Sequence, residues 1–219
     1  MQNTDKRMKQ VLERLRREYP RAGTRLKWNS VFELLVATIL SAQTTDNQVN
    51  NITSKLFKHY NQPRDFAALT PEQLEPLIKG CGLYRNKAVF IIEASRMIVD
   101  RFGGRVPDTL EELMELPGVG RKTANVVLSV GFGKPALAVD THVQRVASRL
   151  GFTTSDNPEH TELQLKSLIP PEEWGRAHHL FIWHGRSLCR SRKPRCRQCP
   201  LSDLCPAAAE YLIETAAGG

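Results

Sequence analysis

Apolar residues recur along this chain with the period of helices that are buried on one side. The pattern predicts an N-terminal helix that ends before Pro20 and a second helix that starts near Val31. Further helices are expected at 89–102, 120–130, 141–150, 159–168 and 172–188. No run shows the alternation of a half-buried strand, so the predicted fold class is all-α.

Helix starts and one boundary can also be placed. Thr45, Thr70 and Thr109 each stand three residues before Gln or Glu, which is the spacing of a capping box, and Pro71 follows at the first helical position. A Gly- and Pro-containing run at 131–135 is the best candidate boundary. It separates a block of helices at about 24–134 from the C-terminal segment.

Four cysteines lie close together near the C-terminus, as Cys189-x6-Cys196-x2-Cys199-x5-Cys205. Four thiolates suit a [4Fe–4S] cluster or a structural zinc ion. Zinc usually takes thiolates as two tight pairs, whereas this chain has one such pair with longer arms, so the cluster is favoured and zinc is the alternative. Disulfides are disfavoured because the chain shows no secretory signal and Cys81 has no obvious partner.

The cysteines enclose a strongly basic loop. Six of the twelve residues of Arg186–Arg197 are Lys or Arg, and no acidic residue occurs between Glu173 and Asp203. Metal ligands on both sides would hold these cations close together, which suits phosphate binding. The alternative is that the arginines only offset the charge of the thiolates. The candidate phosphate contacts are Arg190, Arg192, Lys193 and Arg195.

Composition narrows the class of protein. The 219-residue chain is 41% hydrophobic and has a formal net charge of +8, which indicates a folded protein with a polyanionic partner. Its most apolar stretch, Val31–Leu40, is short and contains Glu33, so no membrane span is expected. Unpaired cysteines and an N-terminus without a signal-type apolar core predict a cytoplasmic, intracellular protein, which we expect to be a monomer.

A second signal is the run Leu-Pro-Gly-Val-Gly-Arg-Lys-Thr-Ala at 116–124. Pro117 and Gly118 predict a tight turn, and Gly118 and Gly120 permit positive φ and the close approach of another molecule. Val119 should anchor the turn, while the helix that starts at Gly120 offers free N–H groups to a phosphate. The run resembles the helix-hairpin-helix motif of many DNA-binding proteins, with an ordinary corner between helices as the alternative.

Two residues, Lys122 and Asp140, are candidates for a catalytic role. Lys122 lies in the first turn of the second hairpin helix, where the helix dipole and nearby cations disfavour an ammonium ion. A neutral lysine can attack C1′ of a deoxyribose and form a Schiff base, but a solvated lysine that binds phosphate fits the sequence as well. Asp140 precedes a helix and fits an N-cap, a position that is compatible with a catalytic role.

These segments together resemble the endonuclease III family of helix-hairpin-helix DNA glycosylases. The resemblance rests on the hairpin run with Lys122, the Val-Asp-Thr-His run at 139–142 and the four-cysteine spacing. Runs at 40–46 and 82–88 resemble two further family segments. The resemblance implies a six-helix barrel domain at 24–134 and a discontinuous iron–sulfur domain at 1–23 and 135–219, with duplex DNA between them.

The family's activity is removal of oxidised pyrimidines in base-excision repair, with β-elimination at the resulting abasic site. The resemblance implies Lys122 as the Schiff-base nucleophile and Asp140 as the carboxylate that activates it and stabilises an oxocarbenium-like sugar. Gln43 and Leu83 match the residues that fill the hole left by an everted base. The implied cofactor is a [4Fe–4S] cluster, and the implied partner is duplex DNA with damaged bases or abasic sites, in the nucleoid. The residues expected near the lesion pocket are Ser41, Asp46 and His142.

Two other functions fit parts of the sequence. An adenine mismatch glycosylase of the same superfamily shares the cluster and the aspartate. That group lacks the lysine at the position of Lys122 and usually carries an extra C-terminal domain, whereas this chain ends soon after Cys205. A non-catalytic DNA-binding module with a structural metal would not need both Lys122 and Asp140. Cys81 is expected to be a small hydrophobic residue and not a ligand.

Overall fold

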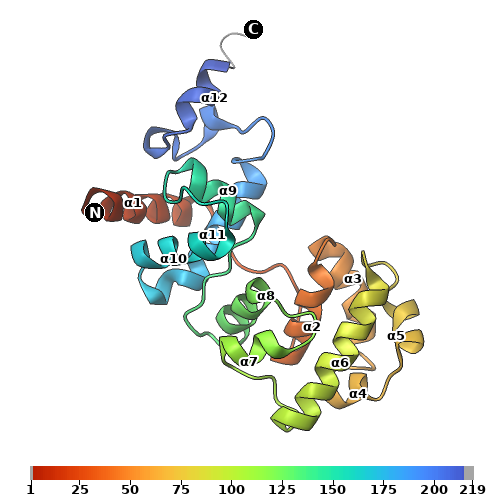
Figure 1. Ribbon diagram of the computed structural model, residues 1–219. Coiled ribbons are helices and arrows are strands. Elements are labelled where there is room, and N and C mark those ends of the chain that lie inside the picture. The colour runs from red at the N-terminus through yellow and green to blue at the C-terminus, as the bar shows by residue number, and fades with distance from the viewer. Residues whose placement is uncertain (1, 215–219) are drawn as a thin grey trace. The chain divides into compact units, whose positions relative to one another are not determined.

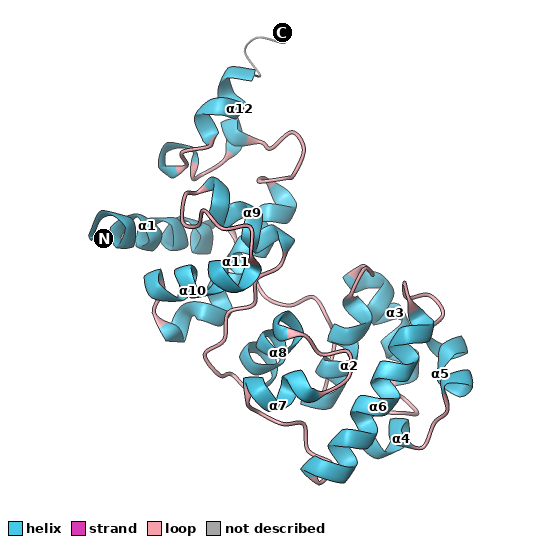
Figure 2. Ribbon diagram, in the orientation of Figure 1, coloured by secondary structure: helices cyan, strands magenta, loops and turns pink. Residues whose placement is uncertain are grey.

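The protein is built from helices (Figure 1 and Figure 2). The structure is a computed structural model that describes residues 2–214, and this part of the chain contains helices and no strand, which confirms the all-α prediction. The chain divides into a central unit, Arg25–Lys134, and a terminal unit, Met1–Thr24 together with Pro135–Gly219. Within the described residues, no helix is both long enough and apolar enough to span a membrane.

The central unit is built around α2 (Val31–Ser41), which is buried from Phe32 to Leu40. This helix is apolar on nearly every side, as expected for a helix inside a core. The ring of Phe32 packs on Phe66 with 5.5 Å between the centroids. The other elements are α3 (Asp46–Leu56), α4 (Pro63–Ala67), α5 (Pro71–Ile78), α6 (Tyr84–Phe102), α7 (Leu110–Glu115), α8 (Arg121–Val126) and the π-helical turn η1 (Val127–Gly131).

The threonines that were predicted to start helices do so. The hydroxyls of Thr45 and Thr109 each accept the N–H of the residue three positions later, at 3.3 Å. The N–H of Thr70 donates to the side chain of Gln73 at 2.9 Å. At Thr109 the hydroxyl also donates to the carboxylate of Glu112, at 2.8 Å. The bonds that involve backbone N–H groups satisfy donors that the first turn of a helix leaves unpaired.

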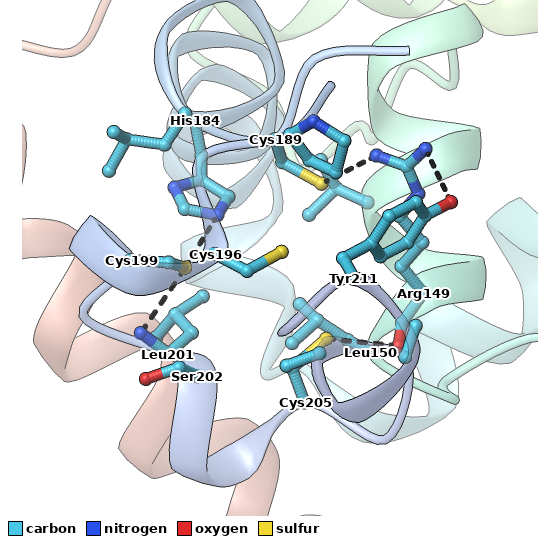
Figure 3. A pocket seen from close by; sticks show the side chains of 15 residues that line it. Arg149, Leu150, His184, Cys189, Cys196, Cys199, Leu201, Ser202, Cys205 and Tyr211 are labelled. Atoms are coloured by element: carbon cyan, nitrogen blue, oxygen red, sulfur yellow. Dashed lines mark hydrogen bonds between the residues drawn. The ribbon is translucent and has the colours of Figure 1, made fainter. Parts of the chain in front are cut away.

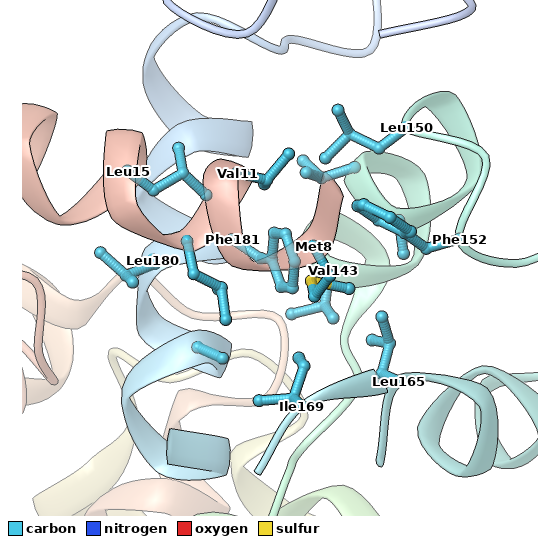
Figure 4. Packing of buried hydrophobic residues seen from close by; sticks show 14 of the residues in the cluster. Met8, Val11, Leu15, Val143, Leu150, Phe152, Leu165, Ile169, Leu180 and Phe181 are labelled. Carbon is cyan, nitrogen blue, oxygen red and sulfur yellow. The ribbon is translucent and has the colours of Figure 1, made fainter. Parts of the chain in front are cut away.

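The terminal unit combines the two ends of the chain around one apolar core (Figure 4). Val143 and Val146 of α9, Phe181 of α11, and Val11 and Leu15 of α1 are buried in the same cluster. The elements are α1 (Gln2–Glu18), α9 (Thr141–Arg149), α10 (Pro158–Leu168), η2 (Pro171–Glu173), α11 (Trp174–Ser187), η3 (Cys196–Gln198), η4 (Ser202–Leu204) and α12 (Ala208–Glu214).

Arginines of α1 bind the C-terminal segment directly. Arg14 donates to the carbonyl of Pro200 at 2.9 Å and forms an ion pair with Asp203. Arg7 donates to the carbonyl of Leu204 at 3.1 Å. The packing of the N-terminal helix could not be derived from its periodicity, because these partners lie almost two hundred residues away in the chain.

Candidate functional site

The hairpin between α7 and α8 turns at residues 116–120. Gly118 has a φ of +77°, and a Cβ there would lie 2.7 Å from the Cβ of Phe90, so the turn requires glycine at this position. Val119 is buried, as expected. Gly120 has a φ of −88°, so it does not use the positive φ that glycine permits. No atom lies within 4 Å of a Cβ built on Gly120, so the start of α8 is open to another molecule.

Lys122 is exposed in the first turn of α8. The helix starts at Arg121, one residue later than predicted, and Gly120 provides no side-chain cap for its first N–H groups. The lysine therefore lies at the positive end of the helix dipole. The arrangement attracts an anion such as a DNA phosphate to the same place as the amine.

Asp140 is the N-cap of α9, which confirms that part of its prediction. Its Oδ1 accepts the N–H of His142 and the N–H of Val143, both at 2.8 Å. Both bonds go to the same oxygen, and the other carboxylate oxygen has no hydrogen-bond partner among the described residues. One oxygen thus positions the side chain while the second remains available for chemistry.

The four C-terminal cysteines line one pocket (Figure 3). Their thiols face a common space between α9, α11 and α12, with Leu150 and Leu201 among the apolar lining residues. No three Cys, His, Asp or Glu side chains in the described part of the chain lie close enough together to hold a single metal ion. The structure therefore brings the predicted ligands into one pocket without forming a site for a lone ion.

Hydrogen-bond donors are placed around two of the sulfurs (Figure 3). The guanidinium of Arg149 donates to the Sγ of Cys189 at 3.4 Å. The N–H of Leu201 donates to the Sγ of Cys199 at 3.4 Å, and the Nε2 of the buried His184 lies 3.6 Å from the same sulfur. Donors of this kind stabilise thiolates that bind a metal centre.

Burial affects the protonation of the cysteine thiols in this pocket. Desolvation raises the pKa of the Cys199 thiol to about 11, and it also raises the pKa of Cys196 and of Cys205. For Arg149, desolvation acts to lower the pKa, but hydrogen bonds and charge attraction from Cys189 and Tyr211 outweigh it and the pKa is raised. A bound metal centre would displace the thiol protons, because only thiolates act as ligands.

The basic loop is closed on itself beside this pocket. The carbonyl of Leu188 accepts the N–H of Arg190 at 3.0 Å and the N–H of Arg195 at 2.9 Å. Arg149 donates to the carbonyl of Arg190 at 2.7 Å, so α9 also holds the loop. Lys193 has a φ of +49°, which is uncommon for a residue with a side chain. The four candidate phosphate contacts, Arg190, Arg192, Lys193 and Arg195, are all exposed.

Gln43 and Leu83 share an unusual backbone conformation. Their φ angles are +53° and +56°, and with Lys193 they are the non-glycine residues with positive φ in the described part of the chain. Both side chains are exposed, Leu83 to 59%. A Cβ on Gly82 would lie 3.2 Å from the carbonyl oxygen of Gln43, so the two loops are in close contact. Strained backbone of this kind clusters at functional sites.

The three residues expected near the lesion pocket lie in different units. Ser41 ends α2 and Asp46 starts α3, both in the central unit. His142 is on α9 in the terminal unit, and its Nδ1 lies 3.1 Å from a guanidinium nitrogen of Arg145. Their assignment to one pocket stays a prediction.

Three residues that make polar contacts near the predicted sites were not expected from the sequence. Lys87 is 4% exposed and lies on the buried face of α6 with Ala88 and Ile91. A lysine at an apolar position of the helical pattern was the available signal. Arg149 and His184 gave no such signal, because their partners are distant in sequence and are brought near only by the fold.

Residues 36–171 match the HhH-GPD superfamily of base excision DNA repair proteins. Endonuclease III of Bacillus subtilis (strain 168) is 47% identical over 201 residues, which cover 91% of this chain and 92% of the relative. The chain belongs to the endonuclease III family. Endonuclease III of Escherichia coli (strain K12) is 45% identical over 203 residues, which cover 93% of this chain and 96% of the relative.

Solved structures agree with membership in the endonuclease III family. A trapped covalent intermediate of endonuclease III with DNA is 45% identical, with a TM-score of 0.91 over 95% of this chain and 98% of that chain. A thermostable thymine-DNA glycosylase is 26% identical, with a TM-score of 0.85 over 94% of this chain and 99% of that chain. The HhH-GPD range contains Lys122 and Asp140 and ends before the four C-terminal cysteines.

The hairpin yields a prediction about stability. Gly118→Ala should lower the free energy of unfolding by about 1–3 kcal/mol, because the new methyl group forces both a left-handed backbone and a contact with Phe90. Gly120→Ala is the matched control and should change stability little, since its φ is negative and its surroundings are open. Urea unfolding of both variants measures the difference, and equal losses would contradict this account of the turn.

Proposed function

We propose that this protein removes oxidised pyrimidines from duplex DNA and then cleaves the strand at the abasic site. As a member of the endonuclease III family it is a base-excision repair DNA glycosylase and abasic-site lyase that acts on damaged bases. The preference for oxidised pyrimidines follows from the family resemblance. The observation that supports the mechanism is the exposure of Lys122 in the first turn of α8. The N-cap of this helix is Gly120, and the hairpin is open at that point.

In this mechanism Lys122 is the nucleophile. Its neutral Nζ attacks C1′ of the deoxyribose, the bond between C1′ and the base breaks, and the base leaves with the electron pair. Opening of the sugar ring gives a Schiff base between the lysine and C1′. Loss of a proton from C2′ then expels the 3′ phosphate by β-elimination, and water releases the lysine.

Asp140 supports the same reaction with the carboxylate oxygen that does not cap α9. That oxygen can take the proton that Lys122 must lose and can stabilise positive charge that develops on the sugar. The capping bonds to the N–H of His142 and Val143 hold the carboxylate in one orientation. Capping and catalysis are therefore compatible in a single side chain.

DNA contacts are proposed at three places. The backbone amides of the hairpin at 118–120 bind phosphates and carry no sequence information. The basic loop at 190–195 adds charge that neutralises further phosphates. Gln43 and Leu83 fill the space left when the damaged base is everted, a step that costs a few kcal/mol and less for a damaged base.

We further propose that Cys189, Cys196, Cys199 and Cys205 hold a [4Fe–4S] cluster. Four thiols that face one pocket, with a single Cys-x2-Cys pair and longer arms on either side, suit a cluster better than one zinc ion. When bound, the cluster supplies metal–thiolate bonds that fix the ends of the basic loop. The chain's own residues hold the rest of the loop through Leu188 and Arg149. Its free thiols accord with a proposed intracellular site of action.

The roles of Lys122 and Asp140 can be separated by experiment. Lys122→Gln should abolish the covalent complex that borohydride traps on abasic-site DNA, while binding to that DNA persists because the hairpin amides remain. Asp140→Asn keeps the capping oxygen but removes the charge, so base excision should fall roughly 10²–10⁴-fold with little loss of stability. Lys134→Gln, at an exposed lysine that pairs with Asp108, is the control and should leave trapping unchanged. A trapped complex with Lys122→Gln would place the nucleophile elsewhere.

The basic loop predicts a salt effect. Arg192→Ala should weaken binding to damaged and undamaged duplexes alike, and it should reduce the slope of log affinity against log salt by about one. Single-turnover cleavage at saturating enzyme should change little. Arg64→Ala, at an exposed arginine of α4, serves as the matched control. Unchanged affinity with a loss of cleavage would contradict a phosphate-binding role.

The proposal of a cluster can be tested by measuring the metal content of the purified protein. The purified protein should be brown and contain about four irons per chain. Cys199→Ser should lose most of the iron, whereas Cys81→Ala should retain it, because Cys81 is a buried thiol of the central unit. A colourless protein with one zinc ion per chain would refute the cluster.

A further inference from the structure

Lys87 is a buried cation held by uncharged oxygens. It lies near the start of α6 and is 4% exposed. Its Nζ donates to the carbonyl of Leu40 at 2.8 Å, to the carbonyl of Ala42 at 2.6 Å and to the hydroxyl of Thr44 at 3.3 Å. The three N–H donors of the ammonium thus match three oxygens. Burying an ammonium is costly and lowers the pKa of Lys87, so the position needs an explanation beyond packing.

The contacts of Lys87 fix the end of α2. The last turn of this helix contains no basic residue, and its final carbonyls lack partners within the helix. Lys87 places a positive charge on the carbonyls of Leu40 and Ala42, where the helix dipole is negative. The chain therefore leaves α2 along one defined path, immediately before Gln43.

The same network holds the neighbouring loop. The hydroxyl of Thr44 donates to the carbonyl of Ala42 at 3.3 Å and accepts the N–H of Gly82 at 3.2 Å, besides the ammonium of Lys87. The backbone N–H of Lys87 donates to the carbonyl of Leu83 at 3.1 Å. That bond is the ordinary one of the first turn of α6, so the side chain of Lys87 holds the loop of Gln43 while its backbone belongs to the turn that follows Leu83.

We propose that Lys87 is a positioning residue that holds Gln43 and Leu83 together as one wedge for the space that an everted base vacates. Both wedge residues adopt the unfavourable left-handed conformation, and a backbone without fixed partners would relax from it. The ammonium and the Thr44 hydroxyl supply those partners. This inference rests on the proposed function, which assigns the wedge to Gln43 and Leu83.

The test uses Lys87→Met, which keeps the apolar stem and removes the ammonium. One probe is a duplex with a tetrahydrofuran abasic analogue opposite 2-aminopurine, whose fluorescence reports displacement of the orphaned base without any catalysis. The second probe is single-turnover excision from a duplex with one oxidised pyrimidine. We expect the variant at saturation to lose most of the fluorescence change and to excise at least about tenfold more slowly, because insertion of the wedge offsets the cost of unstacking. Affinity for undamaged duplex should stay within about twofold.

Two further variants make the result decisive. Ile98→Ala removes a buried side chain from the far part of α6, so it should lower the melting temperature and leave both readouts as in the wild type. Thr44→Val removes the hydroxyl of the network and should reduce both readouts, which tests the inference even if Lys87→Met fails to fold. Wild-type fluorescence and rate in a folded Lys87→Met or Thr44→Val would overturn it.

A separate result would contradict the proposed function. If the wild-type protein neither forms a borohydride-trapped complex nor cleaves abasic DNA, the assigned activity is wrong. The fluorescence comparison between wild type and Lys87→Met still decides the inference in that case, because the tetrahydrofuran duplex requires no reaction.

Discussion

The burial of one face of α9 is the constraint on which the terminal unit depends. Val143, Val146 and Ala147 are inaccessible to solvent, and burial of such side chains contributes about 1.5–3 kcal/mol for each valine. Rotation of the helix would expose this face, so the core fixes the direction of every other side chain on α9. Asp140 at its start and Arg149 at its last residue are oriented as a consequence. The packing of α9 therefore orients both the carboxylate of Asp140 and the side chain of Arg149 at the cysteine pocket.

Backbone strain marks the places where the protein is proposed to meet DNA. Gln43, Leu83 and Lys193 have left-handed conformations, each at a cost of about 1–3 kcal/mol for a residue with a side chain. Two of them lie in the loops that Lys87 and Thr44 connect, and the third lies in the basic loop that Leu188 closes. Hydrogen bonds within these loops hold the backbone on either side of the strained residues. Rigid loops result, which suits recognition of a distorted duplex better than flexible ones.

Local signals in the sequence were sufficient to predict most of the helices and several of the residues at their ends. Short-range hydrogen bonding explains the helix caps at Thr45, Thr70, Thr109 and Asp140. The residue types and their spacing in the sequence are enough to predict it. The five-residue α4 has no periodic signal and was not anticipated.

What could not be predicted depends on distant partners. The helix α8 starts one residue later than expected, and Gly120 takes an extended cap conformation before it. Arg149 meets Cys189 only through the packing of α9, and Lys87 meets Leu40 only through the packing of α6 on α2. Long-range contacts of this kind carry no local pattern.

The discontinuous terminal unit has a consequence for the order of folding during synthesis. The central unit is contiguous, so its residues have all left the ribosome once Lys134 has emerged. The apolar face of α1, with Val11 and Leu15, is made first but has to wait for partners such as Phe181. Domains generally fold as they emerge, so this N-terminal helix is an exposed hydrophobic surface for most of translation. Insertion of the proposed cluster would come later still, because it requires Cys205.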